Sequence, residues 1–415
     1  MKILHISTYD SGGAGLACIR LHKGLLENGY DSKVLVLNKT SDNPEVFKFE
    51  KTSRWLPKFI RWPILFIKLV LHKLRIPSSR FLYYQYKLDS LRAKSSPVYS
   101  LPLSDYDLST HPLVREADLI HLHWTAGFLD WPTFFKNVSK PILWTVHDEN
   151  LYFGGFHYMK EQMDNISYYQ KLEERLIEIK QKSIQQCKNL SIVSLSKMML
   201  DKSLSGRIVG KRKHYVIHNM IDGGIFRPFN QKFSRSVFNL PEDSKILLFI
   251  SYYLHDRNKG FTELVLTLNE LNLPDVVLFA IGTGYREVET QLEIYYSGAI
   301  NDPRLLTLAY SAADTYIIPS IQEAFAQTPL EAMSCGLPIV AFPFSGTEEL
   351  INENNGVRAE DFSKSSLKNA IIKALNTSYN KDVIRKDVST RFGIKNTVEQ
   401  YSEVYMETLK GQINM

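Results

Sequence analysis

The chain contains little cysteine. Only Cys18, Cys187 and Cys335 occur in 415 residues, and they lie far apart. Their spacing fits neither a disulfide framework nor a cysteine-based metal site, and few scattered thiols are typical of a reducing cytoplasm. The sequence also lacks internal repeats and low-complexity tracts, which argues against solenoid and fibrous architectures. We therefore expect a globular cytoplasmic protein.

Long apolar runs are missing as well. Met1 leads directly into a short strand-like segment and a glycine-rich turn, without the apolar h-region of a signal peptide. The stretch richest in large apolar residues lies within residues 51–94, where basic residues and prolines interrupt it. This stretch is too charged to span a bilayer. The sequence thus predicts no transmembrane segment.

The composition that is present indicates a folded protein with two domains. Hydrophobic residues make up 44% of the chain and aromatic residues 12%, which excludes a disordered class. A chain of 415 residues exceeds one ordinary core, so two domains are expected. The net charge is +6, and residues 51–94 hold 11 Lys or Arg residues against one acid, Asp89. We call residues 51–94 the basic segment.

The first half of the chain alternates strands and helices. A strand at residues 2–8, a glycine-rich turn at residues 10–15, a helix and a strand at residues 34–37 form a βαβ unit. Such a unit opens a doubly wound α/β sheet. The turn has the spacing G-G-x-G, and Asn38 follows the second strand where a dinucleotide-binding enzyme has an acid. A dehydrogenase is therefore disfavoured.

The same alternation restarts after a turn-rich linker at residues 222–228. We therefore expect an N-terminal domain at residues 1–222, a C-terminal domain at residues 223–395 and a final helix at residues 396–415. In the second domain a strand at residues 246–251 precedes a loop that carries Arg257 and Lys259. Paired cations after a strand suit two phosphate groups, although Arg257 alone is also explained as a solvated loop charge.

Residues 316–342 carry the most specific pattern. A buried strand, a loop with Glu323, a helix with Glu331 and a second strand follow one another. Loops at the carboxyl ends of parallel strands face the ligand crevice, and the N–H groups at a helix start suit a phosphate. The carboxylates would then accept hydrogen bonds from ligand hydroxyl groups. Taken alone, each carboxylate is better explained as an ordinary helix residue.

Four short matches identify this stretch: Pro319-Ser320, Glu323-Ala324-Phe325-Ala326, Leu330-Glu331-Ala332-Met333 and Cys335-Gly336-Leu337-Pro338. Together they resemble the E-x7-E motif of retaining glycosyltransferases of family 4, which have the GT-B fold. The family usually has glycine where Ala324 and Ala326 stand, and each added methyl group changes how closely the backbone approaches a phosphate. The resemblance covers nearly the whole chain except the basic segment.

Other stretches carry the same resemblance. Thr145-Val146-His147-Asp148 and Gly154-Gly155-Phe156-His157-Tyr158 are similar to motifs of a subgroup that builds bacterial surface polysaccharides, in which the histidine approaches the donor sugar. Gly13 and Gly15 resemble the family's glycine turn near the donor phosphates, and packing explains that turn about equally well. Lys259 matches the family's lysine, whereas Leu254 stands at the usual arginine position and leaves Arg257 as the substitute.

The resemblance implies two Rossmann-like α/β domains facing a cleft, with the C-terminal helix crossing back to the first domain. It implies transfer of a glycosyl group, with retention at the anomeric carbon, from a nucleotide sugar to a saccharide acceptor. Glu323 would bind sugar hydroxyl groups and Glu331 ribose hydroxyl groups. The implied catalytic residues are Glu323, Lys259, Arg257 and His147, and the implied donor-binding residues are Gly13, Gly15, Lys259, Glu323, Ala324, Phe325, Ala326 and Glu331.

No cofactor and no metal ion are expected, because cations are already supplied and no Asp-x-Asp stands in a suitable loop. The basic segment interleaves its cations with Trp55, Phe59, Trp62 and Phe66, which suits an interfacial element on the anionic inner leaflet. A lipid-linked acceptor and peripheral membrane localisation would explain it. The alternative is a helical hairpin packed on the first domain. The apolar content of the basic segment disfavours nucleic acid as a partner.

Alternatives of two kinds stay open. A nucleotide-sugar epimerase or a sugar phosphorylase would have a similar fold, and an epimerase would change the donor with no acceptor present. A non-catalytic partner subunit could use the basic segment to dock at membranes. The presence of Lys259, Glu323 and Glu331 argues against such a subunit.

Overall fold

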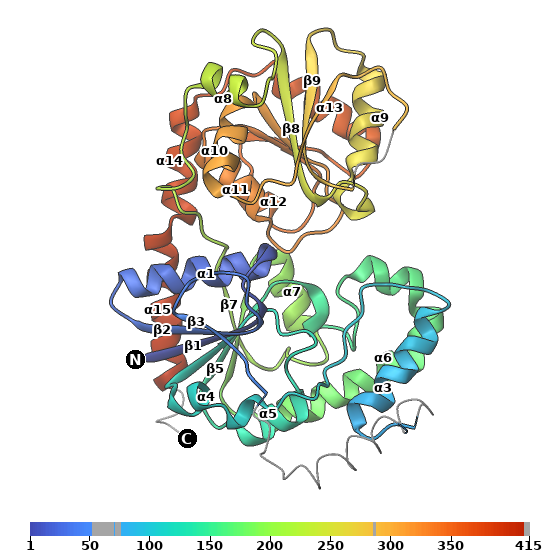
Figure 1. Ribbon diagram of the computed structural model, residues 1–415, viewed down its shortest axis with the longest axis vertical. Helices are drawn as coiled ribbons and strands as arrows, with labels where there is room; N and C mark the ends of the chain where they lie inside the picture. The colour runs from blue at the N-terminus through green and yellow to red at the C-terminus, as the bar shows by residue number, and fades with distance from the viewer. Residues whose placement is uncertain (52–69, 71–75, 285–287, 411–415) are drawn as a thin grey trace. The chain divides into compact units, whose positions relative to one another are not determined.

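The computed structural model describes residues 1–51, 70, 76–284 and 288–410. The chain forms two compact units, each built around its own parallel sheet (Figure 1). Unit 1 comprises Met1–Ser194, Met199–Val216 and Tyr401–Met415, and unit 2 comprises Leu195–Met198 and Ile217–Gln400. The prediction of two Rossmann-like α/β domains is confirmed.

The sheet of unit 1 has the strand order β3-β2-β1-β4-β5-β6-β7, and every strand pair is parallel. Its strands are β1 Lys2–Tyr9, β2 Asp31–Asn38, β3 Val46–Lys48, β4 Leu119–Leu122, β5 Ile142–Val146, β6 Leu190–Ser194 and β7 Lys213–Val216. The central strands are buried on both faces, as parallel strands covered by helices are. Their carboxyl ends therefore form one edge on which polar side chains can gather.

Helices connect and cover these strands. They are α1 Gly12–Glu27, α3 Arg80–Arg92, α4 Pro112–Glu116, α5 Trp131–Asn137, α6 Met159–Gln185, α7 Lys197–Ser205 and the last helix, α15 Ile394–Lys410, with two short 3-10 turns, η1 Leu108–Thr110 and η2 Glu149–Leu151. From Tyr401 onward the last helix belongs to unit 1, where the Tyr405 hydroxyl lies 2.8 Å from Nδ1 of His121.

The sheet of unit 2 has the order β10-β9-β8-β11-β12-β13, again parallel throughout. Its strands are β8 Lys245–Tyr253, β9 Val276–Thr283, β10 Ile294–Gly298, β11 Thr315–Ile318, β12 Ile339–Ala341 and β13 Gly356–Arg358. The order reverses between β8 and β11, so the ends of these two strands are the topological switch point. The edge strands β3, β10 and β13 are not predicted by the sequence analysis.

Helices also flank this second sheet. They are α8 Gln231–Val237, α9 Phe261–Leu271, α10 Pro303–Ala312, α11 Gln327–Ser334, α12 Thr347–Leu350, α13 Lys364–Leu375 and α14 Lys381–Phe392, with η3 Arg257–Lys259 directly before α9. Local chemistry fixes their starts: Asp302, for example, accepts the N–H of Arg304, and proline occupies the first position of α10.

Most of the basic segment, residues 52–69 and 71–75, lies outside the described residues, so its membrane-binding and hairpin interpretations both stay predictions. Its described end is α3, which packs on α6 through Tyr84 and Leu88 in a shared apolar cluster. Within the described part of the chain, every helix is too short or too polar to cross a bilayer.

Candidate functional site

The topological switch point of unit 2 brings two predicted loops into contact. The carbonyl of Asn258, in η3, accepts the N–H of Ile321, in the loop after β11, at 2.8 Å. Gly260 ends η3 with φ +75°, and a Cβ there would lie 2.2 Å from the carbonyl oxygen of Pro319. Only glycine permits that approach, because any other residue would collide with the backbone. The two loops therefore pack directly against each other.

Lys259 and Glu323 meet where these two loops pack. Nζ of Lys259 lies 2.6 Å from Oε1 of Glu323, and both side chains are partly exposed. Burial by itself would lower the pKa of Lys259, but the Glu323 carboxylate raises it overall, so the ammonium group stays charged at neutral pH. The structure thus joins the predicted phosphate-binding cation to the predicted sugar-binding carboxylate.

Arg257 lies in the same 3-10 turn, which Asp256 caps by accepting the N–H of Asn258 at 2.9 Å. The Arg257 side chain is exposed. Among the residues that the structure describes, no ion pair occupies its guanidinium group. Arg257 is therefore a cation next to Lys259 that remains available to an anion.

The start of α11, three residues after Ala324, provides backbone N–H donors at the end of the same loop. Its N-cap residue is Ala326, whose side chain cannot accept a hydrogen bond from the first turn. Uncapped N–H groups at a helix start attract anions. Ala324 and Phe325 are buried, and the Phe325 ring stacks on His218 with its centroid 4.9 Å away. The carbonyl of Phe325 accepts from Nδ2 of Asn219 at 2.7 Å, so this part of the loop is held in place.

Glu331 lies in α11 and is almost fully covered, with 5% of its surface exposed. Its Oε2 accepts the Tyr310 hydroxyl at 2.9 Å. Burial and the neighbouring carboxylate raise the pKa of Tyr310, so its hydroxyl stays protonated and donates. Glu331 is thus anchored to α10, and its predicted contact with ribose hydroxyl groups stays a prediction.

The glycine-rich turn of unit 1 becomes the start of α1. Gly13 is exposed, and a side chain there would meet no atom within 4 Å, whereas a Cβ on Gly15 would lie 2.8 Å from the Tyr9 carbonyl oxygen. Gly15 is therefore required by packing on β1. Gly13 remains free to approach a ligand, because the N-cap Ser11 makes no side-chain cap.

His147 follows β5 and is half-buried at the edge where the strands of unit 1 end. Burial lowers its pKa to about 4, so the imidazole is neutral at physiological pH. The next residue, Asp148, accepts hydrogen bonds from Trp124 Nε1 and His157 Nδ1, each at 2.6 Å. The two histidine motifs of the sequence therefore meet at one buried carboxylate.

Side chains of α6 hold the loop between those motifs in place. The N–H groups of Gly154 and Gly155 donate to the buried Glu173 carboxylate at 2.5 and 2.9 Å. A Cβ on Gly155 would lie 2.2 Å from the Tyr99 ring. Lys180, also on α6 and fully buried, donates to the carbonyl of Asn150 at 2.6 Å. Sequence analysis missed Glu173 and Lys180, because neither stands in a recognisable motif.

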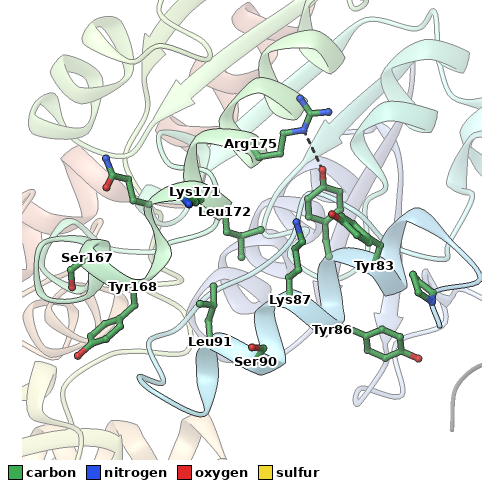
Figure 2. Close-up of a pocket in the computed structure, with 13 residues that line it drawn as sticks. Tyr83, Tyr86, Lys87, Ser90, Leu91, Ser167, Tyr168, Lys171, Leu172 and Arg175 are labelled. Atoms are coloured by element: carbon green, nitrogen blue, oxygen red, sulfur yellow. Dashed lines mark hydrogen bonds between the residues drawn. The ribbon is translucent and has the colours of Figure 1, made fainter. Parts of the chain in front are cut away.

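A large open pocket lies elsewhere in unit 1, between α3 and α6, and Figure 2 shows the side chains around it. Its volume is about 1160 Å³, and its described lining contains no acidic residue. Nε of Arg175 donates to the Tyr84 hydroxyl at 3.2 Å, and Nζ of Lys87 lies 4.4 Å from the centroid of the Tyr83 ring. The pocket thus combines aromatic faces with positive charge. Its aromatic and cationic lining residues are Tyr83, Tyr84, Tyr86, Tyr168, Lys87, Lys171 and Arg175.

Unit 2 is similar to a known family. Residues 230–389 match the family model of the glycosyl transferases group 1. That range includes η3, β11 and α11, and with them Lys259, Glu323 and Glu331. Over residues 230–389, unit 2 is therefore similar to the group 1 glycosyl transferases.

Two proteins of similar sequence are described as glycosyltransferases. The protein is 23% identical to the uncharacterized glycosyltransferase MJ1607 of Methanocaldococcus jannaschii over 95% of this chain and 94% of that one. It is 26% identical to the D-inositol 3-phosphate glycosyltransferase of Mycolicibacterium smegmatis over 155 residues, which span 32% of each chain. The match thus covers about a third of that second relative's length.

Solved structures share the fold of the whole chain. Sucrose-phosphate synthase from Thermosynechococcus elongatus superposes with a TM-score of 0.65 at 17% identity, over 98% of this chain and 99% of that one. Anabaena Alr3699/HepE in complex with UDP-glucose gives 0.63 at 16% identity, over 98% and 100%. Units 1 and 2 therefore have the GT-B fold.

Proposed function

We propose that this protein is a retaining glycosyltransferase of family 4 that moves a glycosyl group from a nucleotide sugar to a saccharide acceptor. The observation that carries the proposal is the contact between Lys259 and Glu323 at the switch point of unit 2. A cation and a carboxylate side by side suit the two ends of a sugar diphosphate: phosphate oxygens and sugar hydroxyl groups. The second carboxylate of the E-x7-E motif, Glu331, follows on α11.

In this proposal the departing nucleoside diphosphate gains negative charge as the bond between the anomeric carbon and the phosphate oxygen breaks. Lys259, Arg257 and the N–H groups at the start of α11 stabilise that charge. Glu323 accepts hydrogen bonds from the donor sugar, and Glu331 binds the ribose. His147 is the polar group that unit 1 offers to a sugar or phosphate oxygen. No metal ion is expected to be required, because these cations supply the positive charge, and chelator should leave turnover unchanged.

The donor is tested first by thermal shift over a panel of nucleotide sugars. UDP-glucose is the natural starting compound, since the solved Anabaena structure of similar fold contains it. A transferase needs an acceptor, so incubation of the donor alone should leave its sugar configuration unchanged. Epimerised donor in that incubation would favour the epimerase alternative. Proton NMR of the new glycosidic bond then decides between retention and inversion.

We further propose that the acceptor is lipid-linked and serves surface-polysaccharide synthesis at the cytoplasmic face of the membrane. Two features support this. The basic segment carries 11 Lys or Arg residues and one acid, and its described end, α3, lines the pocket of Figure 2. Lys87 and Lys171 suit the phosphate of a lipid-linked saccharide, and the tyrosine rings suit its sugar faces.

Vesicle sedimentation tests the membrane part. We expect binding to anionic vesicles at low salt and release at high salt, because surface charge is screened within about 8–10 Å at physiological ionic strength. Replacement of Lys58, Arg61, Lys68 and Lys73 by Gln should abolish binding and preserve the thermal shift caused by donor. The matched control replaces Lys364 and Lys373 of unit 2 and should still sediment. If the wild-type protein ignores anionic vesicles at low salt, the membrane proposal is wrong.

A further inference from the structure

Five of the buried or half-buried histidines in unit 1 lie on or against its central strands. His5 comes from β1, His121 from β4 and His22 from α1, while His123 and His147 directly follow β4 and β5. His5 and His121 are register partners in neighbouring strands. Side chains alternate along a strand, so His121 and His123 point to the same face. Strand register therefore gathers residues that are far apart in sequence.

Three of these rings form a continuous hydrogen-bonded chain. Nδ1 of His5 lies 3.0 Å from Nε2 of His123, and Nδ1 of His123 lies 3.0 Å from Nε2 of His147. Burial lowers the pKa of all three imidazoles, so each is neutral and carries a single proton. Every contact then needs one donor and one acceptor, and all three rings must point their N–H groups in the same direction.

His5, at the buried end of the three hydrogen-bonded imidazoles, determines that direction. Nε2 of His5 is buried and has no hydrogen-bond partner in the described structure. An orphaned buried N–H group is rarer in proteins than an under-used acceptor. The proton of His5 therefore belongs on Nδ1, where it donates to His123. His123 then donates from its own Nδ1 to His147, and the proton of His147 is left on Nδ1.

We propose that His5 and His123 are positioning residues that hold His147 in the tautomer with its proton on Nδ1. His147 is half-buried, and among the described residues no hydrogen bond to its Nδ1 occurs. It would thus present a neutral N–H donor to a sugar or phosphate oxygen of the substrate. That last step rests on the proposed glycosyltransferase function, whereas the tautomer itself does not.

Neighbouring groups keep the chain from rearranging. The His121 ring lies against the His123 ring with centroids 4.2 Å apart. Both nitrogens of His121 are engaged at 2.8 Å, one with the Tyr405 hydroxyl and the other with the Thr145 hydroxyl. The last helix of the protein therefore supports one side of His123, which limits rotation of its ring.

A metal ion is the competing explanation of this cluster. One nitrogen from each of His5, His121 and His123 can be chosen so that the three lie within 4.8 Å of one another. Both nitrogens of His121 already have hydroxyl partners, however, and His5 faces His123 at hydrogen-bond distance. This geometry favours the hydrogen-bonded chain. Bound transition metal near one equivalent per chain, in protein purified without added metal, would overturn it.

The tautomer can be measured directly in wild-type protein without substrate. Long-range proton–nitrogen NMR of protein labelled with 15N-histidine distinguishes Nδ1–H from Nε2–H imidazole, and His147→Asn assigns the signal by its loss. We expect the Nδ1–H pattern for His147. An Nε2–H pattern would overturn the proposal.

Substitutions at His5 test the coupling. His5→Leu should release His147 into a mixture of tautomers, whereas His5→Asn should retain the Nδ1–H form, because its amide donor takes about the place of Nδ1. The control is His22→Leu. His22 is buried but is not one of the three hydrogen-bonded imidazoles, so this substitution should leave the His147 signal unchanged. An unchanged His147 signal in His5→Leu would also refute the coupling.

Activity then separates this proposal from the proposed function. Loss of one neutral hydrogen bond should lower kcat/KM about threefold to tenfold in His5→Leu, with recovery in His5→Asn. If the tautomer is as expected but no nucleotide sugar is bound or turned over, the proposed function fails and the positioning role stands. If turnover is present and falls equally in His5→Leu and His5→Asn, the positioning role fails.

Discussion

Replacing Lys259 with methionine separates a functional lysine from a structural one. Methionine keeps most of the length and apolar volume of lysine and removes the charge. Nζ of Lys259 has the Glu323 carboxylate 2.6 Å away, so the substitution leaves that carboxylate without its cation. The same substitution removes the positive charge that we assign to the leaving diphosphate.

The expected sizes of the two effects differ. The Lys259 and Glu323 side chains are 34% and 15% exposed, between a surface pair and a buried one. Breaking this pair should cost about 1–2 kcal/mol, between the ~0.2–1 kcal/mol of exposed pairs and the ~3–5 kcal/mol of buried ones. That cost corresponds to a fall in Tm of about 2–8 °C. Loss of a preorganised electrostatic group in the transition state costs about 3–4 kcal/mol, or roughly 10²–10³ in kcat.

The assay combines thermal unfolding with initial rates at saturating donor. The matched control is Lys364→Met, which breaks the exposed Lys364–Glu270 pair in the same unit and should change neither kcat nor Tm appreciably. Arg257→Met should lower kcat with little change in Tm, because its guanidinium group is exposed. A Lys259→Met protein with a Tm loss of this size and kcat within threefold of wild type would refute the assigned role.

Three further predictions follow from other contacts. Glu331→Gln should weaken donor binding by about 1–3 kcal/mol in calorimetry, and unchanged affinity would remove Glu331 from the donor site. Lowering the pH from 7.5 to 5 should destabilise unit 1 in chemical denaturation, because His22 has a pKa of about 4 in the folded protein against 6.5 when unfolded. The unfolded state then binds more protons, which costs about 2 kcal/mol for this residue at pH 5, and His22→Gln should reduce the loss of stability by about that amount. Gly155→Ala should lower stability by about 1–3 kcal/mol, because its methyl group would lie 2.2 Å from the Tyr99 ring; a Tm equal to that of wild type would contradict this packing.

Much of the fold could be predicted from local sequence. Apolar runs such as residues 246–249 predict buried parallel strands, because a strand covered on both faces needs no polar alternation. The positions of Lys259 and Glu323 after two such strands place them at the carboxyl edge of a sheet. Since β8 and β11 are neighbours in that sheet, the two loops meet. For this part of the site, the sequence predicted the two residues and their place after a strand, and the pairing of β8 with β11 brought them together.

Other features required the tertiary structure. Nothing near His5 in sequence indicates a contact with His123, 118 positions away, and the contact exists because β1 pairs with β4 in one register. Likewise, Glu173 and Lys180 are ordinary helix residues by pattern, yet packing against the Gly154–Gly155 loop buries both. Local sequence determines which residues form strands, helices and turns, because backbone preferences and apolar periodicity act over short distances. Strand register and helix packing determine which polar side chains become partners, because buried donors and acceptors are satisfied only by groups that the fold brings within hydrogen-bond distance.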